Sequence, residues 1–573
     1  MPKRARYACL ALIALSSAPA LAAAICASKF HTARSVVSVL LTTAVEAVLI
    51  AALTRTWRRF FVVNFPLFVV GLVFALYTVQ FGVPPGRLLA LIVVNTTWEE
   101  VTGFLELGRG TTLALLIALP LVYAYLVSQA SPLPMFARKP AGATARISFS
   151  RLLLLACLFA TAYVAGNPDE MIDGAAYNPL IGTAMFLAAE IPRARADASG
   201  AHVAKIAYRA RLVTSEEVHI LVIGESARRD SWSAYGYTRS TTPHLDELRQ
   251  EVIFLQNAVA DANMTSWSVP IILTGSGTKE MLYGRIRGNL LDLAHEAGYN
   301  TAWLVNQDAG ISAYVGIHAD RETYIPQINA GFFGRRALDE TLLPAFRQEI
   351  ALSRFPRFIG IHTMGSHWPY EHRYPPNFRH FGNTGADVSS IPSPGPRHSA
   401  GPEIGQPPQA RPLGKGTSQE TNAYDDSVLY TDWFLSEIIE HVRALSVPAT
   451  VTFFPDHGED LLQLDGVYGH AGPAYTRHAF EIPAFVWLSD AYRKAYPQKV
   501  AAIQKNASKE IRSHDVFATE ADLMGIQYSE AVAQRSFASE QFLPDTRMQH
   551  IAGGSLVNPP RPTARAGLSQ PAR

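Results

Sequence analysis

Cysteine is scarce in this chain: only three of the 573 residues are cysteines, and Cys9, Cys26 and Cys157 all lie in or beside apolar segments. The polar C-terminal part has none, so it depends on no disulfide, on whichever side of a membrane it lies. A strong excess of charge is also lacking, because the formal net charge is +2. The whole chain therefore gives no electrostatic basis for nucleic-acid binding, and we expect no nucleic-acid partner.

The first 167 residues consist instead largely of long apolar segments. A membrane-spanning helix needs about 20 mostly apolar residues. Five segments are candidates for such spans: 7–25, 36–53, 60–81, 111–127 and 152–165. The first also resembles a cleaved signal peptide, because Lys3, Arg4 and Arg6 precede it and small residues surround Leu21. We favour its retention, and its removal would not reverse the other spans.

Basic residues cluster on alternate sides of these segments. The clusters precede the first span, separate the second from the third, and separate the fourth from the fifth: Lys3, Arg4 and Arg6; Arg55, Arg58 and Arg59; Arg138, Lys139, Arg146 and Arg151. Cytoplasmic loops carry the excess of lysine and arginine, so the polar domain is predicted to leave the membrane on the outer side. In a bacterium with two membranes, this predicts a multi-pass inner-membrane protein with a periplasmic domain.

The loop at 82–110, between the third and fourth spans, combines an apolar run with the polar sequence NTTWEEVTGFLEL. Spacing alone favours an interfacial amphipathic helix that Asn95 or Thr96 caps. The alternative is a platform near the membrane surface that holds a lipid head group, with Glu99, Glu100 and Glu106 as its acids.

Composition divides the rest of the chain into three parts. Residues 168–215 form a mixed connector, and 216–528 form the candidate catalytic domain. Within that domain, 383–418 is rich in Pro, Gly and Ser and is predicted to be a disordered surface insertion. A C-terminal extension covers 529–573, and we expect no structure from about Ala552 onward, where prolines accumulate.

The candidate catalytic domain begins with the sequence VHILVIGE. Its β-branched apolar run, Val218–Ile223, is typical of a strand buried on both faces of a parallel sheet. The run stops at Gly224, and the carboxylate of Glu225 follows. In open α/β sheets, ligand groups gather beyond the carboxyl ends of strands. Glu225 is therefore a candidate site residue.

A second apolar strand leads into acids and an imidazole in ATVTFFPDHGED. Asp456 and His457 can both turn toward one ion, because Gly458 relieves crowding where the chain bends. Oxygen and nitrogen ligands of this kind suit Zn²⁺, with Mn²⁺ as an alternative. By itself this sequence would more often be a surface turn. Glu225 at another strand end, together with downstream histidines, favours a metal site, and Glu459 follows in the same stretch.

The downstream histidines are His367 in FIGIHTMGSHWP and His470 in GVYGHAGP, each in a loop that contains glycine. His362 precedes its loop and is predicted to be a satisfied histidine within a strand. Four further histidines have no comparable setting and are predicted to be structural or exposed: His372, His380, His441 and His478.

Two hydroxyls are candidate nucleophiles. Ser226 follows Glu225 directly. Thr265 lies where the polar sequence DANMTSW gives way to an apolar helix, and free N–H groups at a helix N-terminus favour a bound phosphate. A divalent ion would activate either hydroxyl. A plain N-cap is the more common role for a residue placed like Thr265, and both roles are compatible.

In this order after five spans, the motifs GESARRD, TSWSVP, GSHWP, DHGED and GHAGP resemble those of the membrane phosphoethanolamine transferases of the alkaline-phosphatase superfamily. The resemblance covers nearly the whole chain, including NTTWEE. It implies an α/β fold: a five-helix transmembrane bundle followed by an alkaline-phosphatase-like α/β/α sandwich with a mostly parallel sheet.

The same resemblance implies roles for individual residues. Glu225, Thr265, Asp456 and His457 would hold a catalytic zinc ion. Thr265, rather than Ser226, would attack phosphatidylethanolamine and carry the phosphoethanolamine as a covalent intermediate. His367, Glu459 and His470 would bind the transferred group, or a second zinc ion during turnover. Asn95 and Glu99 would hold the donor lipid.

The chain also departs from the lipid A-modifying members of that family. Those members have disulfides in the catalytic domain. They also have a lysine in the loop after the strand that reads TAWLV in this chain, and this chain has Asn306, Gln307 and Asp308 in that loop instead. GESARRD and WLVNQ are more similar to the branch that modifies core sugars or periplasmic glycans. We expect phosphatidylethanolamine as donor, a lipopolysaccharide or periplasmic glycan as acceptor, and a monomer.

Three other functions compete with this interpretation. A phosphoglycerol transferase of the lipoteichoic-acid-synthase type would have the same anchor and a similar metal site. A phosphodiesterase or sulfatase fits less well, because five spans suit a soluble substrate poorly. A non-catalytic membrane sensor or scaffold would be expected to have a broken metal set, yet Glu225, Asp456 and His457 are all present.

Overall fold

The computed structural model forms two compact units, Met1–Arg195 and Ala196–Arg573. Each unit is described by itself. The described residues are 2–30, 33–54, 56–81, 89–90, 110–134, 183–184, 186–192, 206–212, 216–307, 315–325, 337–352, 355–381, 419–461, 469–470, 472, 475–529 and 531–559.

The N-terminal unit contains four long helices where the first four apolar segments are predicted to span: α1 (Lys3–Phe30), α2 (Ala33–Thr54), α3 (Trp57–Phe81) and α6 (Gly110–Gln129). Within α1 and α3, the stretches Lys3–Ala22 and Trp57–Thr78 are long and apolar enough to cross a membrane. The five-helix bundle is therefore not confirmed. The fifth predicted span, 152–165, lies outside the described residues, as do Asn95 and Glu99.

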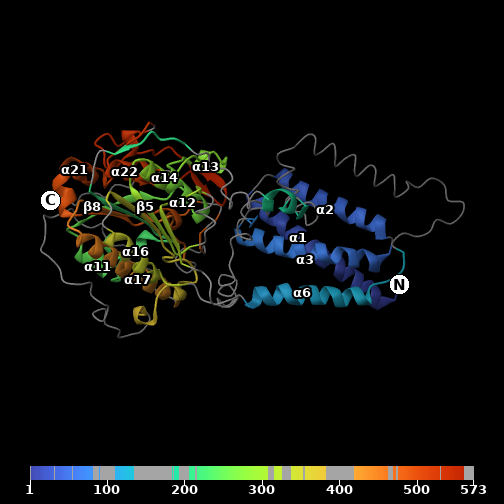
Figure 1. Cartoon of the computed structure of the whole chain (residues 1–573). Coiled ribbons are helices and arrows are strands. Elements are labelled where there is room, and N and C mark those ends of the chain that lie inside the picture. The colour runs from blue at the N-terminus through green and yellow to red at the C-terminus, as the bar shows by residue number, and fades with distance from the viewer. Residues whose placement is uncertain are drawn as a thin grey trace, which may run out of the picture. The chain divides into compact units, whose positions relative to one another are not determined.

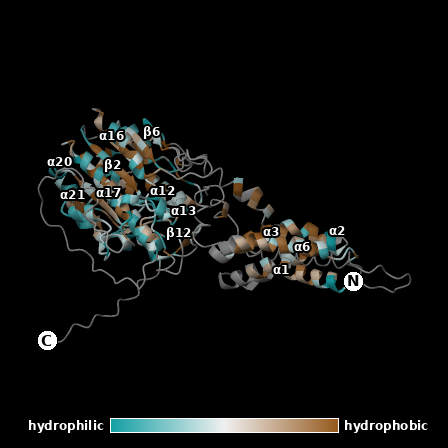
Figure 2. Ribbon diagram, turned by 90° about the horizontal axis from the view of Figure 1, so that it is seen from below, coloured by the Kyte–Doolittle hydropathy of each residue, from teal (hydrophilic) through white to brown (hydrophobic). Residues whose placement is uncertain are grey.

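Helix α1 packs against α2, α3 and α6. Tyr123 of α6 is fully buried against Phe61 and Phe68 of α3. Its hydroxyl lies 3.1 Å from the Ser16 hydroxyl, and Asn64 donates to Ser16 at 3.0 Å. Buried polar groups must find partners inside an apolar bundle, and this cluster provides them. Figure 2 shows hydrophobic residues over much of α3 and α6, whereas α20 and α21 of the other unit are largely hydrophilic.

The C-terminal unit is built on a seven-stranded sheet with the order β3-β9-β8-β2-β7-β5-β6. Its strands are β2 (Val218–Ile223), β3 (Val252–Leu255), β5 (Asn300–Val305), β6 (Arg321–Tyr324), β7 (Arg357–His362), β8 (Ala449–Phe453) and β9 (Ala484–Leu488). Strand β9 is antiparallel to both of its neighbours, and the other described pairs are parallel. β2 is fully buried, as its continuous apolar run predicts. The predicted mostly parallel sheet is confirmed.

Helices cover both faces of this sheet. Figure 1 shows α12, α14 and α22 on one side of the strands and α11, α16 and α17 on the other. The helices of this unit are α11 (Pro243–Glu247), α12 (Thr265–Thr274), α13 (Thr278–Leu282), α14 (Leu290–Glu296), α16 (Leu343–Ala351), α17 (Gln419–Arg443), α19 (Arg477–Phe480), α20 (Asp490–Ala495), α21 (Pro497–Asn506) and α22 (Asp515–Leu523). The result is a three-layer α/β/α sandwich. The predicted insertion at 383–418 lies outside the described residues.

Short elements complete the two units. The two-stranded sheets pair β1 (Arg211–Leu212) with β11 (Ile526–Gln527), β4 (Asn257–Val259) with β10 (Glu510–Arg512), and β12 (His550–Ala552) with β13 (Ser555–Val557). The short 3₁₀ helices are Arg229–Ser231, Ser233–Tyr235, Asp339–Leu342, Tyr370–His372, Pro376–Phe378 and Ala533–Arg535, and Phe186–Glu190 is a π-helix.

The β12–β13 hairpin corrects the prediction that no structure is present from Ala552 onward. Ile551 donates its backbone N–H to the Asp261 carbonyl at 2.8 Å and accepts from the Asn263 N–H at 3.1 Å. These bonds satisfy the buried backbone of the loop before α12, which gives this segment a reason to be ordered. The prolines on which the prediction rests begin only at Pro559.

Candidate functional site

The candidate site lies where three neighbouring parallel strands end. β2 pairs with β7 on one side and with β8 on the other, both in parallel. Glu225 follows β2, Asp456 and His457 follow β8, and His367 lies in the loop after β7. Because the carboxyl ends of parallel strands meet at one edge of the sheet, residues far apart in the sequence come together there.

Glu225, Asp456 and His457 form a compact and fully buried group. His457 Nε2 lies 3.5 Å from Glu225 Oε1 and 3.4 Å from Asp456 Oδ2. Asp456 Oδ2 has no hydrogen-bond partner within the described part of the chain. A buried carboxylate oxygen without a partner is costly unless something else compensates it. Two carboxylates and an imidazole are a donor set that suits a divalent ion such as zinc.

The turn that presents Asp456 and His457 requires Gly458. A Cβ atom on Gly458 would lie 2.0 Å from the His478 carbonyl oxygen. That distance is too short for any larger residue without movement of the backbone. His457 Nδ1 lies 2.8 Å from the Gly458 carbonyl. Because a carbonyl only accepts, the proton of a neutral His457 sits on Nδ1, which leaves Nε2 as the ligand atom.

Thr265 is the first residue of α12, and its hydroxyl faces the same group. Thr265 Oγ1 lies 3.1 Å from Glu225 Oε2 and 3.3 Å from His457 Nε2. Ser268, one turn later, donates to the Asp456 carbonyl and ties the helix to the site. The hydroxyl thus adjoins the proposed ligand atoms at the edge of the sheet.

Ser226 has a different environment from Thr265. It is fully buried, its hydroxyl donates to Glu225 Oε1 at 2.7 Å, and its backbone N–H donates to Asp456 Oδ1 at 3.2 Å. Its φ of 53° places it in the left-handed region that non-glycine residues seldom adopt. These contacts make Ser226 a support for the two carboxylates, whereas Thr265 is only partly buried.

Burial and charge shift the pKa values of the group in opposite directions. Burial, and then the neighbouring Asp456, raises the pKa of Glu225 to about 8. Burial likewise raises the pKa of Asp456 to about 6, although the hydrogen bonds that its carboxylate accepts from backbone N–H groups lower that pKa in part. Burial and nearby His470 lower the pKa of His457 to about 4. Without an ion, therefore, His457 is neutral at pH 7 and Glu225 is mainly protonated.

A second group adjoins the first through His457 and contains Glu459 and His470. Glu459 is fully buried and accepts from the Tyr370 hydroxyl at 2.6 Å. His470 Nδ1 lies 2.7 Å from Glu459 Oε2. Burial by itself would lower the pKa of His470. The negative charge of Glu459, with those of the other nearby acids, outweighs this effect and raises the pKa of His470 to about 9. The His367 ring lies 5.7 Å from the His470 ring, so His367 borders this group.

The remaining predicted histidines lie elsewhere. His362 is buried in β7 and stacks on Trp303 with ring centroids 6.3 Å apart. Burial lowers the pKa of His362 to about 3. Its Nε2 has no hydrogen-bond partner among the described residues, so the prediction that His362 is fully hydrogen-bonded holds only in part. Four histidines belong to neither of the groups that could hold a metal among the described residues: His372, His380, His441 and His478.

Gln307 is a site residue to which sequence reasoning assigns no role. It follows β5, and its side-chain amide donates to Glu225 Oε2 at 3.1 Å and to the Thr363 carbonyl at 3.0 Å. The signal was a polar residue two positions after the end of a strand, the same spacing that Glu225 has after β2. Tyr370 was missed for a different reason: nothing in its local sequence points to the carboxylate that it binds.

Comparison with known proteins identifies relatives of this chain. A family model described as Sulfatase matches residues 218–526. The Escherichia coli phosphoethanolamine transferase EptC is 26% identical over 339 residues, which cover 57% of this chain and 54% of that protein. The chain thus spans about half the length of the curated relative it matches.

Two solved structures share the fold. The zinc complex of the periplasmic domain of Escherichia coli EptC superposes with a TM-score of 0.51 at 23% identity, over 61% of this chain and 95% of that one. The integral membrane lipooligosaccharide phosphoethanolamine transferase A from Neisseria meningitidis superposes with a TM-score of 0.60 at 20% identity, over 84% and 90%. At these identities the likeness establishes an alkaline-phosphatase-like α/β fold.

Proposed function

Because the chain belongs to the sulfatase family, whose model matches residues 218–526, we propose that it is a phosphoethanolamine transferase that uses Thr265 as its nucleophile. The donor is phosphatidylethanolamine, and the acceptor is a lipopolysaccharide or a periplasmic glycan. The observation that carries the proposal is the position of Thr265 Oγ1, 3.1 Å from Glu225 and 3.3 Å from His457 at the start of α12. The name of the relative EptC supports this choice of reaction.

The donor set supports zinc as the cofactor. Glu225, Asp456 and His457 would hold the ion together with the Thr265 hydroxyl, and the unpartnered Asp456 Oδ2 is the ligand atom that most needs a cation. When bound, zinc would acidify the Thr265 hydroxyl and offset charge on the phosphate oxygens. Mn²⁺ is the less suited alternative. His367, Glu459 and His470 would bind the transferred group, or a second zinc ion during turnover.

The reaction consists of two displacements at phosphorus. Thr265 Oγ1 forms a bond to phosphorus as the bond from phosphorus to the diacylglycerol oxygen breaks, which leaves phosphoethanolamine on Thr265. The acceptor hydroxyl then attacks the same phosphorus, and Thr265 departs. In the first step the Thr265 hydroxyl loses its proton and the diacylglycerol oxygen takes one up. In the second step the acceptor hydroxyl loses its proton and the departing Thr265 oxygen takes one up. His367 or His470 accepts and returns the proton in each step. The free N–H groups at the start of α12 favour the phosphate charge.

Membrane anchoring follows from the identity of the donor. Confinement to the surface where phosphatidylethanolamine is concentrated lowers the entropic cost of encounter. In this proposal the protein is a monomer, is multi-pass in the bacterial inner membrane and has its catalytic unit in the periplasm. Asn95 and Glu99 hold the lipid head group.

The test is the mass of Thr265 after incubation of the full-length protein with phosphatidylethanolamine vesicles. We expect a phosphoethanolamine adduct on wild-type Thr265 and none after Thr265→Ala, with unchanged folding by circular dichroism. The matched control is Ser266→Ala, which removes the adjacent hydroxyl and should still form the adduct. An adduct at the wild-type rate in Thr265→Ala would exclude the assignment, and a phosphoglycerol mass would identify a different transferase.

A further inference from the structure

A pocket lies at the end of α12 opposite to Thr265. It has a volume of 330 Å³ and forms between the end of α12, the start of α22 and the segments that carry Tyr208 and Arg535. Thr274, the last residue of α12, contributes to its wall. A ten-residue helix is about 15 Å long, so the pocket is separate from the site at Thr265.

The pocket carries an excess of positive charge. Arg285, Arg287 and Arg535 line it, and Glu280 is its one acidic residue. Arg285 and Arg287 are exposed, and neither forms an ion pair with any described residue. Arg535 lies 3.9 Å from Asp515 and 3.8 Å from Asp545, which is too far for hydrogen bonds. The planar donor fork of arginine matches phosphate oxygens well.

Two hydroxyls lie beside these arginines. Thr274 Oγ1 donates its one proton to the Pro270 carbonyl at 2.7 Å, so in the 2.8 Å contact between the two hydroxyls Ser276 Oγ is the donor and Thr274 the acceptor. Gly275 between them has a φ of 65°, and a Cβ atom there would lie 3.0 Å from Phe517. The left-handed turn at the end of α12 therefore brings both hydroxyls onto the pocket wall.

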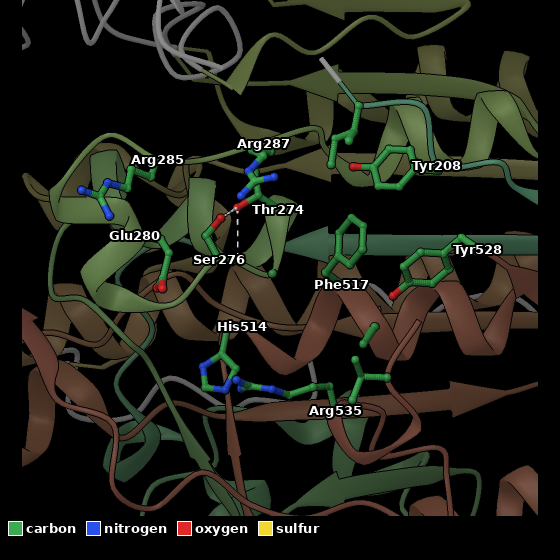
Figure 3. Close-up of a pocket in the computed structure, with 14 residues that line it drawn as sticks. Tyr208, Thr274, Ser276, Glu280, Arg285, Arg287, His514, Phe517, Tyr528 and Arg535 are labelled. Carbon is green, nitrogen blue, oxygen red and sulfur yellow. Dashed lines mark hydrogen bonds between the residues drawn. The ribbon is translucent and has the colours of Figure 1, made fainter. Parts of the chain in front are cut away.

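The other side of the pocket is aromatic. Figure 3 shows Tyr208, Phe517 and Tyr528 together, across from Arg285 and Arg287. The Tyr208 ring lies 6.1 Å from both other rings, and Phe517 lies 5.9 Å from Tyr528. A pocket with an apolar wall and a few convergent polar groups is typical of a small-molecule site. An aromatic wall opposite cationic groups suits a ligand with one ring face and one anionic end.

We propose that this pocket binds a phosphorylated sugar of the glycan acceptor, with the phosphate on the arginines and the sugar ring against the aromatic wall. This inference rests on the proposed transferase function. The distance along α12 separates the recognised sugar from the reacting hydroxyl, so the acceptor spans several sugar units. The pocket selects phosphorylated glycans and takes no part in the chemistry at Thr265.

Direct binding tests the pocket independently of catalysis. Isothermal titration of the full-length protein with glucose 6-phosphate should give saturable binding, whereas glucose and inorganic phosphate should bind at least about tenfold more weakly. Arg285→Gln combined with Arg287→Gln should weaken glucose 6-phosphate binding about tenfold or more. The matched control combines Lys494→Gln with Lys505→Gln, two exposed lysines that do not line the pocket. It removes the same charge and should change nothing.

Equal binding of glucose 6-phosphate by the wild type and the double arginine variant would overturn the proposal. Equal affinity for inorganic phosphate and glucose 6-phosphate would also overturn it, because the aromatic wall would then contribute nothing.

Activity assays separate a failure of the pocket from a failure of the proposed function. In the arginine variant, adduct formation on Thr265 should proceed at the wild-type rate. The KM for a phosphorylated oligosaccharide should rise about tenfold with kcat retained, and the KM for the same oligosaccharide after dephosphorylation should not change. If no protein forms the adduct, the transferase function fails while the binding result still decides the pocket. An unchanged KM for the phosphorylated acceptor would contradict its role in acceptor binding.

Discussion

Glu225 and Asp456 place two carboxylates in one fully buried group. No lysine or arginine among the described residues forms an ion pair with either of them. Burial raises the pKa of both, to about 8 and about 6. An ion-free site is therefore under electrostatic stress at neutral pH, because one carboxylate must keep a proton that it would lose in water. A divalent cation removes this cost, which is the residue-scale reason for expecting metal.

This stress predicts how the stability of the metal-free protein depends on pH. The pKa of Glu225 rises from 4.5 to about 8 on folding, so between these values the folded state binds more protons than the unfolded state. The free energy of unfolding should therefore fall as pH rises from 4.5 to 8, by up to about 1.4 kcal/mol per pH unit from this group. Thermal unfolding of chelated full-length protein across this range measures the effect.

The control for this prediction is Glu225→Gln, which removes the titrating group but keeps its shape. The chelated variant should lose the part of the slope that Glu225 contributes. Zinc should raise the unfolding temperature of the wild type most at pH 8 and that of the variant much less. A slope that persists unchanged in the variant would assign the pH dependence to other groups.

At the scale of elements, α12 is held in place by a buried ionic network in the loop before it. Asp261 accepts from Arg512 Nε at 2.7 Å and from the His514 backbone N–H at 2.9 Å. Burial would raise the pKa of Asp261, but Arg512 and His514 hold it well below its usual range. The β12–β13 hairpin bonds to the same loop. Asp261 therefore acts as a positioning residue for Thr265.

We expect Asp261→Asn to destabilise the protein by about 3–5 kcal/mol, because Arg512 would remain buried without its charged partner. Adduct formation on Thr265 should slow while zinc affinity stays near the wild-type value, since Glu225, Asp456 and His457, the three proposed ligands, lie on other segments. Denaturant unfolding, zinc titration and the rate of adduct formation measure the three quantities. If Asp261 had a purely structural role, the substitution would lower stability, but the folded fraction of the protein would still form the adduct at the wild-type rate.

The matched control for this variant is Asp246→Asn. Asp246 pairs with Arg249 at 2.6 Å, but both side chains are partly exposed, at 34% and 26%. Solvent screens such a pair, so its loss should cost less than about 1 kcal/mol. Equal destabilisation by the two substitutions would mean that the Asp261 network is not the buried support described above.

At the scale of the whole molecule, the chain joins an apolar helical unit to a mixed α/β unit. The proposed metal ligands and Thr265 all belong to the second unit. In the proposed reaction, the first unit would act through access to the lipid donor.

A protease site inserted at 196–205 tests this division of labour. After cleavage, the released C-terminal unit should still bind zinc but should form the Thr265 adduct from phosphatidylethanolamine vesicles at least about tenfold more slowly, because it is no longer confined to the surface that holds its donor. The same insertion left uncleaved is the control. An undiminished rate after cleavage would show that anchoring is irrelevant to donor capture.

The sequence alone determined the sheet edge and its acids. Glu225 lies two residues after the end of β2, and Asp456 and His457 lie three and four residues after the end of β8. Neighbouring parallel strands must end at one edge. Local patterns of this kind are visible without coordinates because both the strand and the polar residue after it lie in one short stretch. The order of the motifs also indicated the family.

Only the tertiary structure decided what depends on segments distant in the chain. The residues alone left Ser226 and Thr265 as alternatives. In the structure Ser226 is fully buried and bonds to both carboxylates, whereas Thr265 is only partly buried. The arginine-lined pocket draws on Tyr208, Arg285 and Arg535, which no periodicity connects. Such sites arise from packing between elements, and packing is set by the whole fold rather than by any local run of residues.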